Sequence, residues 1–237
     1  VVAFMNSSYI PVGVALLGTG IPMVASEHIG PQHYRRRYAE WLLMQALPLF
    51  ADKITVVSAQ IKQSFNAWLR RKMTVIANPV SLTPAPRADA CEGKSGPSKR
   101  LLSVGRLAPQ KNQACLIDAF GKIAADLPDW SLRIAGEGEL RQALESQVAD
   151  AGLGGRVELA GNIADISAEY RSADLFVLPS SYESFGLATA EAIMHGLPVI
   201  GFADCPGTNE LIRHGENGVL VSGVDKTDAL AKAMAAL

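Results

Sequence analysis

The sequence predicts an α/β fold of two lobes, each built on a parallel sheet, and three observations lead to this expectation. Short runs of apolar and β-branched residues alternate with longer stretches of helical periodicity in both halves of the chain. Such alternation is typical of parallel strands joined by helices that cover both faces of a sheet. A segment rich in proline, glycine and charge separates the halves, and 237 residues are enough for two lobes.

Composition limits the class of protein. Hydrophobic residues make up 49% and charged residues 19%, as in an ordinary globular protein. A net charge of −1 gives no overall attraction to nucleic acid, so a phosphate site has to be local. Three cysteines without metal-like spacing fit a reducing, cytoplasmic compartment. The apolar stretch 10–24 is too short, and too interrupted by Pro11 and Pro22, to cross a bilayer.

Residues 1–80 predict the closing part of one lobe. Apolar runs indicate strands at 21–26, 54–57 and 75–77, and Ser58 is a typical N-cap for a helix after the second of these. A further helix is predicted over 34–50 because apolar residues recur there at helical spacing. The apolar positions expected on one broad face of this helix are Tyr38, Trp41, Leu42, Met44 and Leu49.

The second half restarts the alternation after residues 81–100, whose prolines, glycines and charges predict a linker. Residues 101–237 then predict a doubly wound lobe. Strands are expected at 101–104, 131–135, 156–160, 174–178, 198–201 and 218–221, and helices at 113–126, 139–151, 165–172, 186–195, 208–213 and after Asp225. In sheets of this kind, ligands bind beyond the carboxyl ends of the strands.

Two carboxylates follow one of these strand ends. Glu183 lies in the loop after strand 174–178, and Glu191 lies eight positions later in the helix that Gly186 opens. The N-terminus of a helix offers unpaired backbone N–H groups and favours phosphate. Two carboxylates beside an anion site fit a ligand with hydroxyl groups at both ends and phosphate between them. A nucleotide sugar is such a ligand.

Two basic residues follow the strand at 101–104. Arg106 and Lys111 lie five positions apart in a turn, where a guanidinium and an ammonium are suited to neutralise a diphosphate. A solvated basic loop is the alternative interpretation. The interpretation of this pair as a diphosphate site therefore depends on the carboxylates that follow the strand at 174–178.

Glycines follow the next two strands. Gly136 begins a Gly-Glu-Gly segment, but Arg141 stands where a dinucleotide fingerprint has its third glycine, so a plain tight turn is the alternative. Gly161, Asn162 and Ile163 are placed to present backbone groups to a nucleobase. An ordinary loop explains them equally well.

Taken in order, these segments resemble the retaining GT-B glycosyltransferases of family four, the glycosyl transferases group 1. The motifs run G-R-L-x-x-x-K-N, G-E-G, V-E-L-A-G, A-D-L-F-V-L-P-S-x-x-E-S-F-G-L-x-x-x-E-A, G-x-P-V-I and G-E-N-G. The resemblance is close over 100–222 and looser over 1–80. It implies two Rossmann-like lobes: an acceptor-side lobe over 1–80, which we expect to be incomplete in a truncated chain, and a nucleotide-sugar lobe over 101–237.

The resemblance also implies residue roles. Glu183 would contact the donor sugar, Glu191 the ribose, and Arg106 with Lys111 the diphosphate. His28, after a buried strand, matches a histidine near the reacting carbon; Glu27 beside it, or a purely structural histidine, is the alternative. Further donor contacts are expected from Gly105, Gly136, Asn162, Ile163, Phe185, Gly186, Leu187 and Ala188.

The activity implied by the resemblance is transfer of a hexosyl group from a nucleoside diphosphate sugar to a glycan or lipid-linked acceptor. The configuration would be retained, and no metal ion or cofactor would be needed. The rivals are an epimerase or phosphorylase on the same fold, and a nucleotide-sugar-binding fragment without catalysis. The stretch 204–210 resembles bacterial polysaccharide-building members. Lipid-linked acceptors make contact of Arg35, Arg36 and Arg37 with the inner face of the membrane a further expectation, against an ordinary solvated face.

Overall fold

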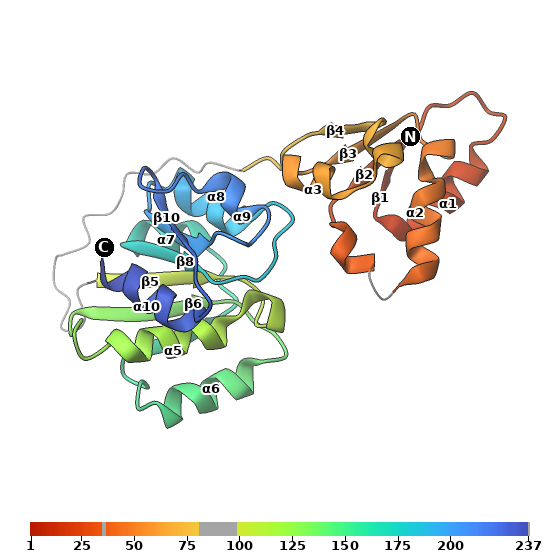
Figure 1. Ribbon diagram of the computed structural model, residues 1–237. Coiled ribbons are helices and arrows are strands. Elements are labelled where there is room, and N and C mark those ends of the chain that lie inside the picture. The colour runs from red at the N-terminus through yellow and green to blue at the C-terminus, as the bar shows by residue number, and fades with distance from the viewer. Residues whose placement is uncertain (35–36, 81–98, 237) are drawn as a thin grey trace. The chain divides into compact units, whose positions relative to one another are not determined.

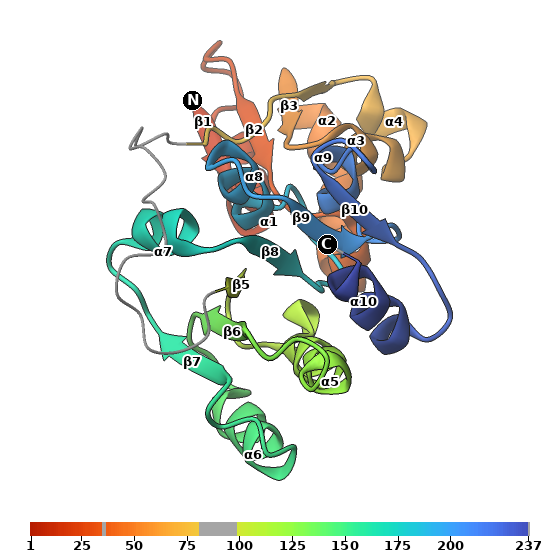
Figure 2. The ribbon, with the colours of Figure 1, turned by 90° about the vertical axis from the view of Figure 1, so that its left-hand side faces the viewer.

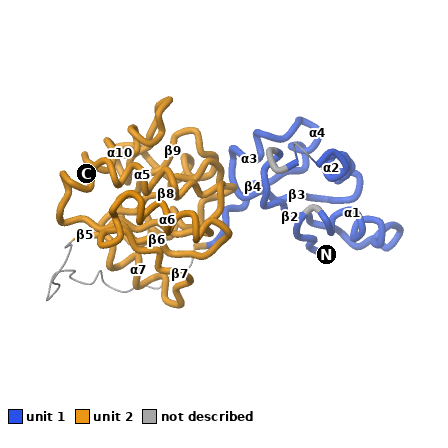
Figure 3. The backbone as a smooth tube through the Cα atoms, turned by 90° about the horizontal axis from the view of Figure 1, so that it is seen from below, with its two compact units in different colours: residues 1–79 blue, residues 80–237 orange. Residues whose placement is uncertain are grey.

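The computed structural model describes residues 1–34, 37–80 and 99–236. The chain divides into two compact units, Val1–Pro79 (unit 1) and Val80–Leu237 (unit 2), which Figure 3 shows in different colours. Each unit is a parallel sheet with helices packed on it. The predicted α/β class with two parallel sheets is therefore confirmed.

Unit 1 is a four-stranded parallel sheet in the order β1-β2-β3-β4. Its strands are β1 (Val2–Phe4), β2 (Val24–Glu27), β3 (Lys53–Val56) and β4 (Met73–Val75). The connections contain α1 (Asn6–Ala15), the 3₁₀ helix η1 (Pro31–Tyr34), α2 (Tyr38–Phe50), α3 (Ala59–Ser64) and α4 (Ala67–Arg70). As predicted, Ser58 caps α3: its hydroxyl accepts a hydrogen bond from the Ile61 amide at 3.1 Å.

Two features of unit 1 differ from the prediction. The sequence analysis missed β1 and α1, because Pro11 and Gly13 interrupt the helical pattern. In the structure Gly13 has a packing role, since a Cβ there would lie 2.6 Å from Cβ of Phe50 in α2. The close approach of α1 to α2 therefore requires glycine at this position.

The prediction for α2 is also wrong in part: the helix begins at Tyr38 rather than at 34, and its five predicted apolar positions do not share one buried face. Tyr38, Leu42 and Leu49 are 77%, 68% and 70% exposed, whereas Met44 and Leu47 are buried. Apolar residues occur almost all round this helix, so periodicity alone does not select the side that faces the sheet.

Unit 2 is a six-stranded parallel sheet in the order β10-β9-β8-β5-β6-β7 (Figure 2). Its strands are β5 (Lys99–Val104), β6 (Trp130–Ala135), β7 (Val157–Gly161), β8 (Leu175–Leu178), β9 (Val199–Phe202) and β10 (Gly218–Val221). Its helices are η2 (Pro109–Lys111), α5 (Gln113–Ile123), α6 (Arg141–Asp150), α7 (Ile166–Ser172), α8 (Leu187–Met194), α9 (Thr208–Leu211) and α10 (Lys226–Ala235). Lys99 and Arg100, the last residues of the predicted linker, open β5; residues 81–98 lie outside the described residues.

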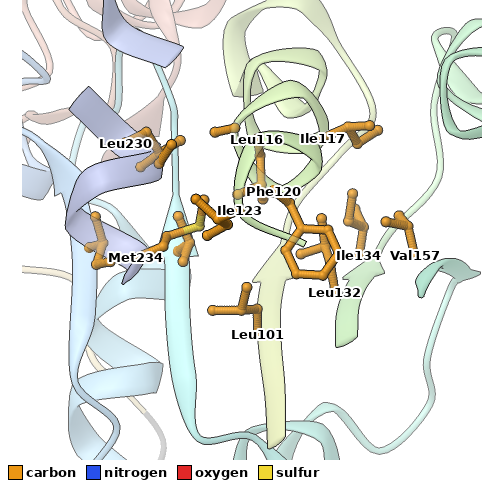
Figure 4. Close-up of a cluster of buried hydrophobic side chains, with 14 of the residues drawn as sticks. Leu101, Leu116, Ile117, Phe120, Ile123, Leu132, Ile134, Val157, Leu230 and Met234 are labelled. Carbon is orange, nitrogen blue, oxygen red and sulfur yellow. The ribbon is translucent and has the colours of Figure 1, made fainter. Parts of the chain in front are cut away.

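Side chains of the central strand β5 alternate between two hydrophobic clusters, one on each face of the sheet. Leu101 packs under α5, α6 and α10, whereas Leu102 packs under α7 and α8. Figures 1 and 2 show these two sets of helices on opposite faces. In Figure 4, side chains of α10 meet those of α5 above the strands, and the residues involved are Leu116, Ile123, Leu230 and Met234.

The strand order of unit 2 contains a reversal. From β5 the chain moves outward to β6 and β7, then returns to place β8 on the other side of β5. The loops that leave the carboxyl ends of β5 and β8 consequently diverge above neighbouring strands. In open α/β sheets this switch point is where ligands bind.

No helix among residues 1–34, 37–80 and 99–236 combines the length and the apolar character needed to cross a membrane.

Candidate functional site

Hydrogen bonds join the two loops that diverge at the switch point of unit 2. The loop after β5 ends in η2, and the loop after β8 runs to Gly186, the N-cap of α8. The Ser181 amide donates to the Gln110 carbonyl at 2.9 Å, and Nε2 of Gln110 donates to the Tyr182 carbonyl at 2.5 Å. These bonds hold the segments that carry Lys111 and Glu183 beside each other.

Lys111 and Glu183 form an ion pair across the switch point. Nζ of Lys111 lies 2.6 Å from Oε1 of Glu183, and the side chains are 19% and 11% exposed. A Cβ at Gly105 would lie 3.3 Å from Cδ and Cε of Lys111, so this glycine leaves room for the lysine stem. The ammonium retains two further donors, and the carboxylate retains its second oxygen. The pair can therefore bind a ligand without separating.

Glycines occupy the carboxyl ends of three neighbouring strands. Gly105, Gly136 and Gly161 follow or end β5, β6 and β7, and the Gly136 amide donates to the Gly161 carbonyl at 2.8 Å. A Cβ at Gly136 would lie 2.1 Å from the Gly105 carbonyl oxygen, a distance that excludes any side chain. The strand ends thus present bare backbone at the edge where a ligand is expected.

Arg106 is exposed beside these glycines, and its side chain forms no hydrogen bond or ion pair within the described part of the chain. Asn162 is exposed and Ile163 is half-buried directly after Gly161. The sequence analysis treated Arg141 as a departure from a fingerprint. In the structure its guanidinium binds Oε1 of Glu137 at 2.5 Å and the Leu159 carbonyl at 3.1 Å.

The N-terminus of α8 lies at the end of the loop after β8. Gly186, as predicted, opens the helix; its φ of 87° belongs to the left-handed region, and no side chain caps the first turn. The amides of Leu187 and Ala188 lie in that uncapped turn, half-buried Phe185 precedes it, and such a helix end attracts anions. A Cβ at Gly207 would lie 2.7 Å from the Glu183 carbonyl, so the loop packs closely against its neighbour.

Glu191, one turn further along α8, has a partner that the sequence analysis did not identify. The hydroxyl of Tyr170 donates to Oε2 of Glu191 at 2.9 Å. Burial and the adjacent carboxylate raise the pKa of Tyr170 well above its ordinary value, so the hydroxyl remains a neutral donor. No sequence signal separated Tyr170 from other core aromatic residues.

In unit 1, His28 is half-buried directly after β2. Its Nε2 lies 3.0 Å from Oγ of Ser26, and its ring centroid lies 6.0 Å from that of Phe4. Glu27, the alternative candidate, is 1% exposed and enclosed within unit 1, where it accepts from the Ile29 amide and the Tyr34 hydroxyl. Burial raises the pKa of Glu27 to about 7.

Neither of two hollows on the surface of unit 2 is lined by Lys111 or Glu183, the pair at the carboxyl edge of the sheet. A hollow of about 430 Å³ lies at the opposite edge, where Pro198 and Asn217 precede β9 and β10. Another of about 270 Å³ lies beyond the carboxyl ends of β9 and β10, beside Asp204 and Lys226. Within the described ranges, no cluster of three or more His, Cys, Asp or Glu side chains is arranged to hold a metal ion.

Fold and site together define a two-lobed α/β protein of the GT-B class. The crystal structure of Anabaena HepE with UDP and glucose superposes with a TM-score of 0.83 at 22% identity, covering 99% of this chain and 67% of that one. The chain belongs to the glycosyl transferases group 1 family, whose family model matches residues 87–237.

Curated relatives agree with this membership. The chain is 30% identical over 200 residues to an uncharacterized glycosyltransferase of Haemophilus influenzae, covering 82% of this chain and 55% of the relative. It is 26% identical over 232 residues to a Campylobacter jejuni α-1,4-N-acetyl-D-galactosaminyltransferase, covering 98% of this chain and 62% of the relative. The chain thus spans between half and two thirds of the length of these relatives.

Proposed function

We propose that the chain carries the donor site of a retaining glycosyltransferase that moves a hexosyl group from a nucleoside diphosphate sugar to a glycan or lipid-linked acceptor. The observation that carries the proposal is the Lys111–Glu183 pair at the switch point of unit 2. It combines a cation for phosphate with a carboxylate for sugar hydroxyls at the sheet edge where ligands bind. Membership of the glycosyl transferases group 1 family supports it.

The proposed donor lies along the carboxyl edge of the sheet. Lys111 and Arg106 bind the diphosphate, together with the uncapped amides of α8. Glu183 accepts from hydroxyl groups of the sugar, and Glu191 accepts from the ribose. The backbone at the ends of β5, β6 and β7 and the start of α8 completes the contacts, through Gly105, Gly136, Asn162, Ile163, Phe185, Gly186, Leu187 and Ala188.

The proposed chemistry uses no nucleophile from the protein. The bond between the anomeric carbon and the phosphate oxygen breaks while the acceptor hydroxyl bonds to the same face of that carbon. The departing phosphate takes the hydroxyl proton, and Lys111 and Arg106 stabilise the negative charge that develops on it. These two cations supply the positive charge that a divalent ion supplies in metal-dependent enzymes. His28 is proposed to contact the sugar near the reacting carbon.

The names of relatives guide the choice of substrates. The Campylobacter relative is named for transfer to a saccharide on undecaprenyl diphosphate, and the HepE structure contains UDP and glucose. We therefore propose a UDP-hexose as the first donor to test and a lipid-linked saccharide of polysaccharide biosynthesis as the acceptor. With such an acceptor, the proposed place of action is the cytoplasm, at the inner face of the membrane.

Replacement of Lys111 by alanine tests the assignment. Lys111→Ala should lower transfer from UDP-hexoses by about two orders of magnitude or more, the typical loss when one such electrostatic contact is removed. The measurement is UDP release and glycoside formation with a panel of UDP-hexoses, accompanied by calorimetric titration of UDP. Lys232→Ala, which removes an exposed lysine of α10, is the matched control and should leave both unchanged.

Near-normal transfer by the Lys111→Ala variant would contradict the proposal. Epimerised or phosphorolysed sugar formed without an acceptor would instead identify one of the rival activities. Tight UDP binding without any turnover of UDP-hexose would indicate a binding module.

A further inference from the structure

Tyr170 occupies an unusual position for a core aromatic residue. It lies in α7, is 1% exposed, and packs in the hydrophobic cluster beneath α7 and α8, with its ring centroid 5.8 Å from that of Phe176. Its hydroxyl nevertheless leaves this cluster and reaches α8. There it donates to Oε2 of Glu191 at 2.9 Å, with the Ala188 carbonyl at 3.3 Å.

Glu191 is held at two points by neighbouring aromatic rings. His195, the C-cap of α8, stacks on Tyr170 with ring centroids 5.1 Å apart and an interplanar angle of 26°. Its Nδ1 lies 2.8 Å from the backbone carbonyl of Glu191. Tyr170 thus fixes the side chain of Glu191, and the stacked imidazole contacts its backbone.

The two oxygens of the Glu191 carboxylate differ. Oε2 is engaged by Tyr170, whereas Oε1 has no hydrogen-bond partner within the described part of the chain. A glutamate side chain loses rotamer freedom when it binds a ligand, and a tyrosine fixed by packing removes part of that loss in advance. The free oxygen is consequently presented in one direction.

We propose that Tyr170 is a positioning residue for donor recognition. By holding Oε2 of Glu191, it directs Oε1 toward the ribose diol of the nucleotide and makes the site discriminate ribose from a sugar without these hydroxyl groups. The proposal rests on the proposed function, in which Glu191 binds the ribose.

Calorimetric titration of the full chain with UDP and with 2′,3′-dideoxy-UDP tests this role. The unaltered protein should prefer UDP by about tenfold to a hundredfold, the range for hydrogen bonds to a charged group. Tyr170→Phe keeps the ring stack but removes the hydroxyl, so the preference should fall to about threefold or less. Affinity for the dideoxy nucleotide should stay unchanged, which a general loss of structure would not allow.

A double-mutant cycle with Glu191→Gln shows whether Tyr170 acts through Glu191. The variant with both changes should prefer UDP over the dideoxy nucleotide at least as strongly as Glu191→Gln alone does, because both changes remove the same contact. Tyr9→Phe is the matched control, since Tyr9 is also 1% exposed and donates its hydroxyl at 2.6 Å, to the Ser26 carbonyl in unit 1. It should retain the full preference.

A folded Tyr170→Phe protein that still prefers UDP as strongly as the unaltered chain overturns the proposal. If Tyr170→Phe does not fold, full discrimination in Glu191→Gln overturns it equally. Failure of the proposed function has a different signature: the unaltered chain then binds UDP weakly, or Lys111→Ala binds it as well as the unaltered chain does.

Discussion

At the scale of single residues, the switch point depends on glycines that leave room for their neighbours as much as on charged side chains. Lys111 reaches Glu183 because Gly105 leaves space beneath its stem, and the strand ends meet because Gly136 has no side chain. The sequence indicated Lys111 and Glu183 as partners of one ligand. Their direct ion pair depends on the loops after β5 and β8, which only the fold brings together.

Gly136→Ala should destabilise unit 2. The new Cβ would lie 2.1 Å from the Gly105 carbonyl, and the φ of 141° is unfavourable for alanine. The steric clash and the unfavourable backbone conformation together should lower the free energy of unfolding by about 2 kcal/mol or more. Urea denaturation followed by the fluorescence of Trp130, after replacement of Trp41 and Trp68 by phenylalanine, measures the change in unit 2.

Gly154→Ala is the matched control for this prediction. A Cβ at Gly154 meets nothing within 4 Å, so this change should leave the unfolding midpoint almost unaltered. Equal stability of the Gly136 and Gly154 variants would show that the strand ends do not need glycine.

At the scale of elements, the alternation of strands and helices in unit 2 was predictable because short apolar runs alternate there with longer stretches of helical periodicity. The six strands lie close to their predicted positions. Prediction was poorer in unit 1, because Pro11 interrupts the helical pattern of α1 and apolar residues occur on almost all sides of α2. In both helices the tertiary contacts, rather than the local pattern, decide which side chains are buried.

Glu27 links two elements of unit 1 and should make its stability depend on pH. Its carboxyl group joins the end of β2 to η1 through Tyr34, and burial raises its pKa from 4.5 to about 7. Between these values the folded form keeps a proton that the unfolded chain has released. The free energy of unfolding of unit 1 should therefore fall as pH rises, by about 3 kcal/mol in all.

Urea denaturation between about pH 4 and about pH 8 measures this dependence. Trp41 and Trp68 report on unit 1 once Trp130 is replaced by phenylalanine, and Trp41 lies 6.2 Å from Tyr34 between ring centroids. Glu27→Gln should flatten the curve, because it removes the titrating group. A curve of the same slope in the Glu27→Gln variant would assign the pH dependence to other groups.

At the scale of the whole molecule, a net charge of −1 means that any attraction to an anionic surface has to be local. The sequence places Arg35, Arg36 and Arg37 together; Arg35 and Arg36 lie outside the described residues, and Arg37 is exposed and paired with Glu40 at 3.0 Å. Exposed Tyr38 follows directly, and exposed Leu42 lies one turn further along α2. Basic and apolar side chains in this order are typical of a membrane-surface contact.

Reversal of these three charges tests the membrane contact. Replacement of all three arginines by glutamate should weaken binding to vesicles containing phosphatidylserine by about tenfold or more, since each basic residue near such a surface contributes about 1 kcal/mol. Co-sedimentation with vesicles measures this. Reversal of Arg70 and Arg71, both exposed and also in unit 1, is the control. An equal effect of both changes would refute a specific contact through residues 35–37.

The sequence by itself determined the class of fold, the order of strands and helices in unit 2, and the residue types gathered at the strand ends. These follow from local periodicity and from motifs whose spacing is fixed along the chain. Only the tertiary structure decided that Lys111 pairs with Glu183, that Tyr170 supports Glu191, and that Glu27 is enclosed rather than exposed. Such contacts join residues distant in the chain, and strand order and helix packing, which local pattern does not encode, bring them together.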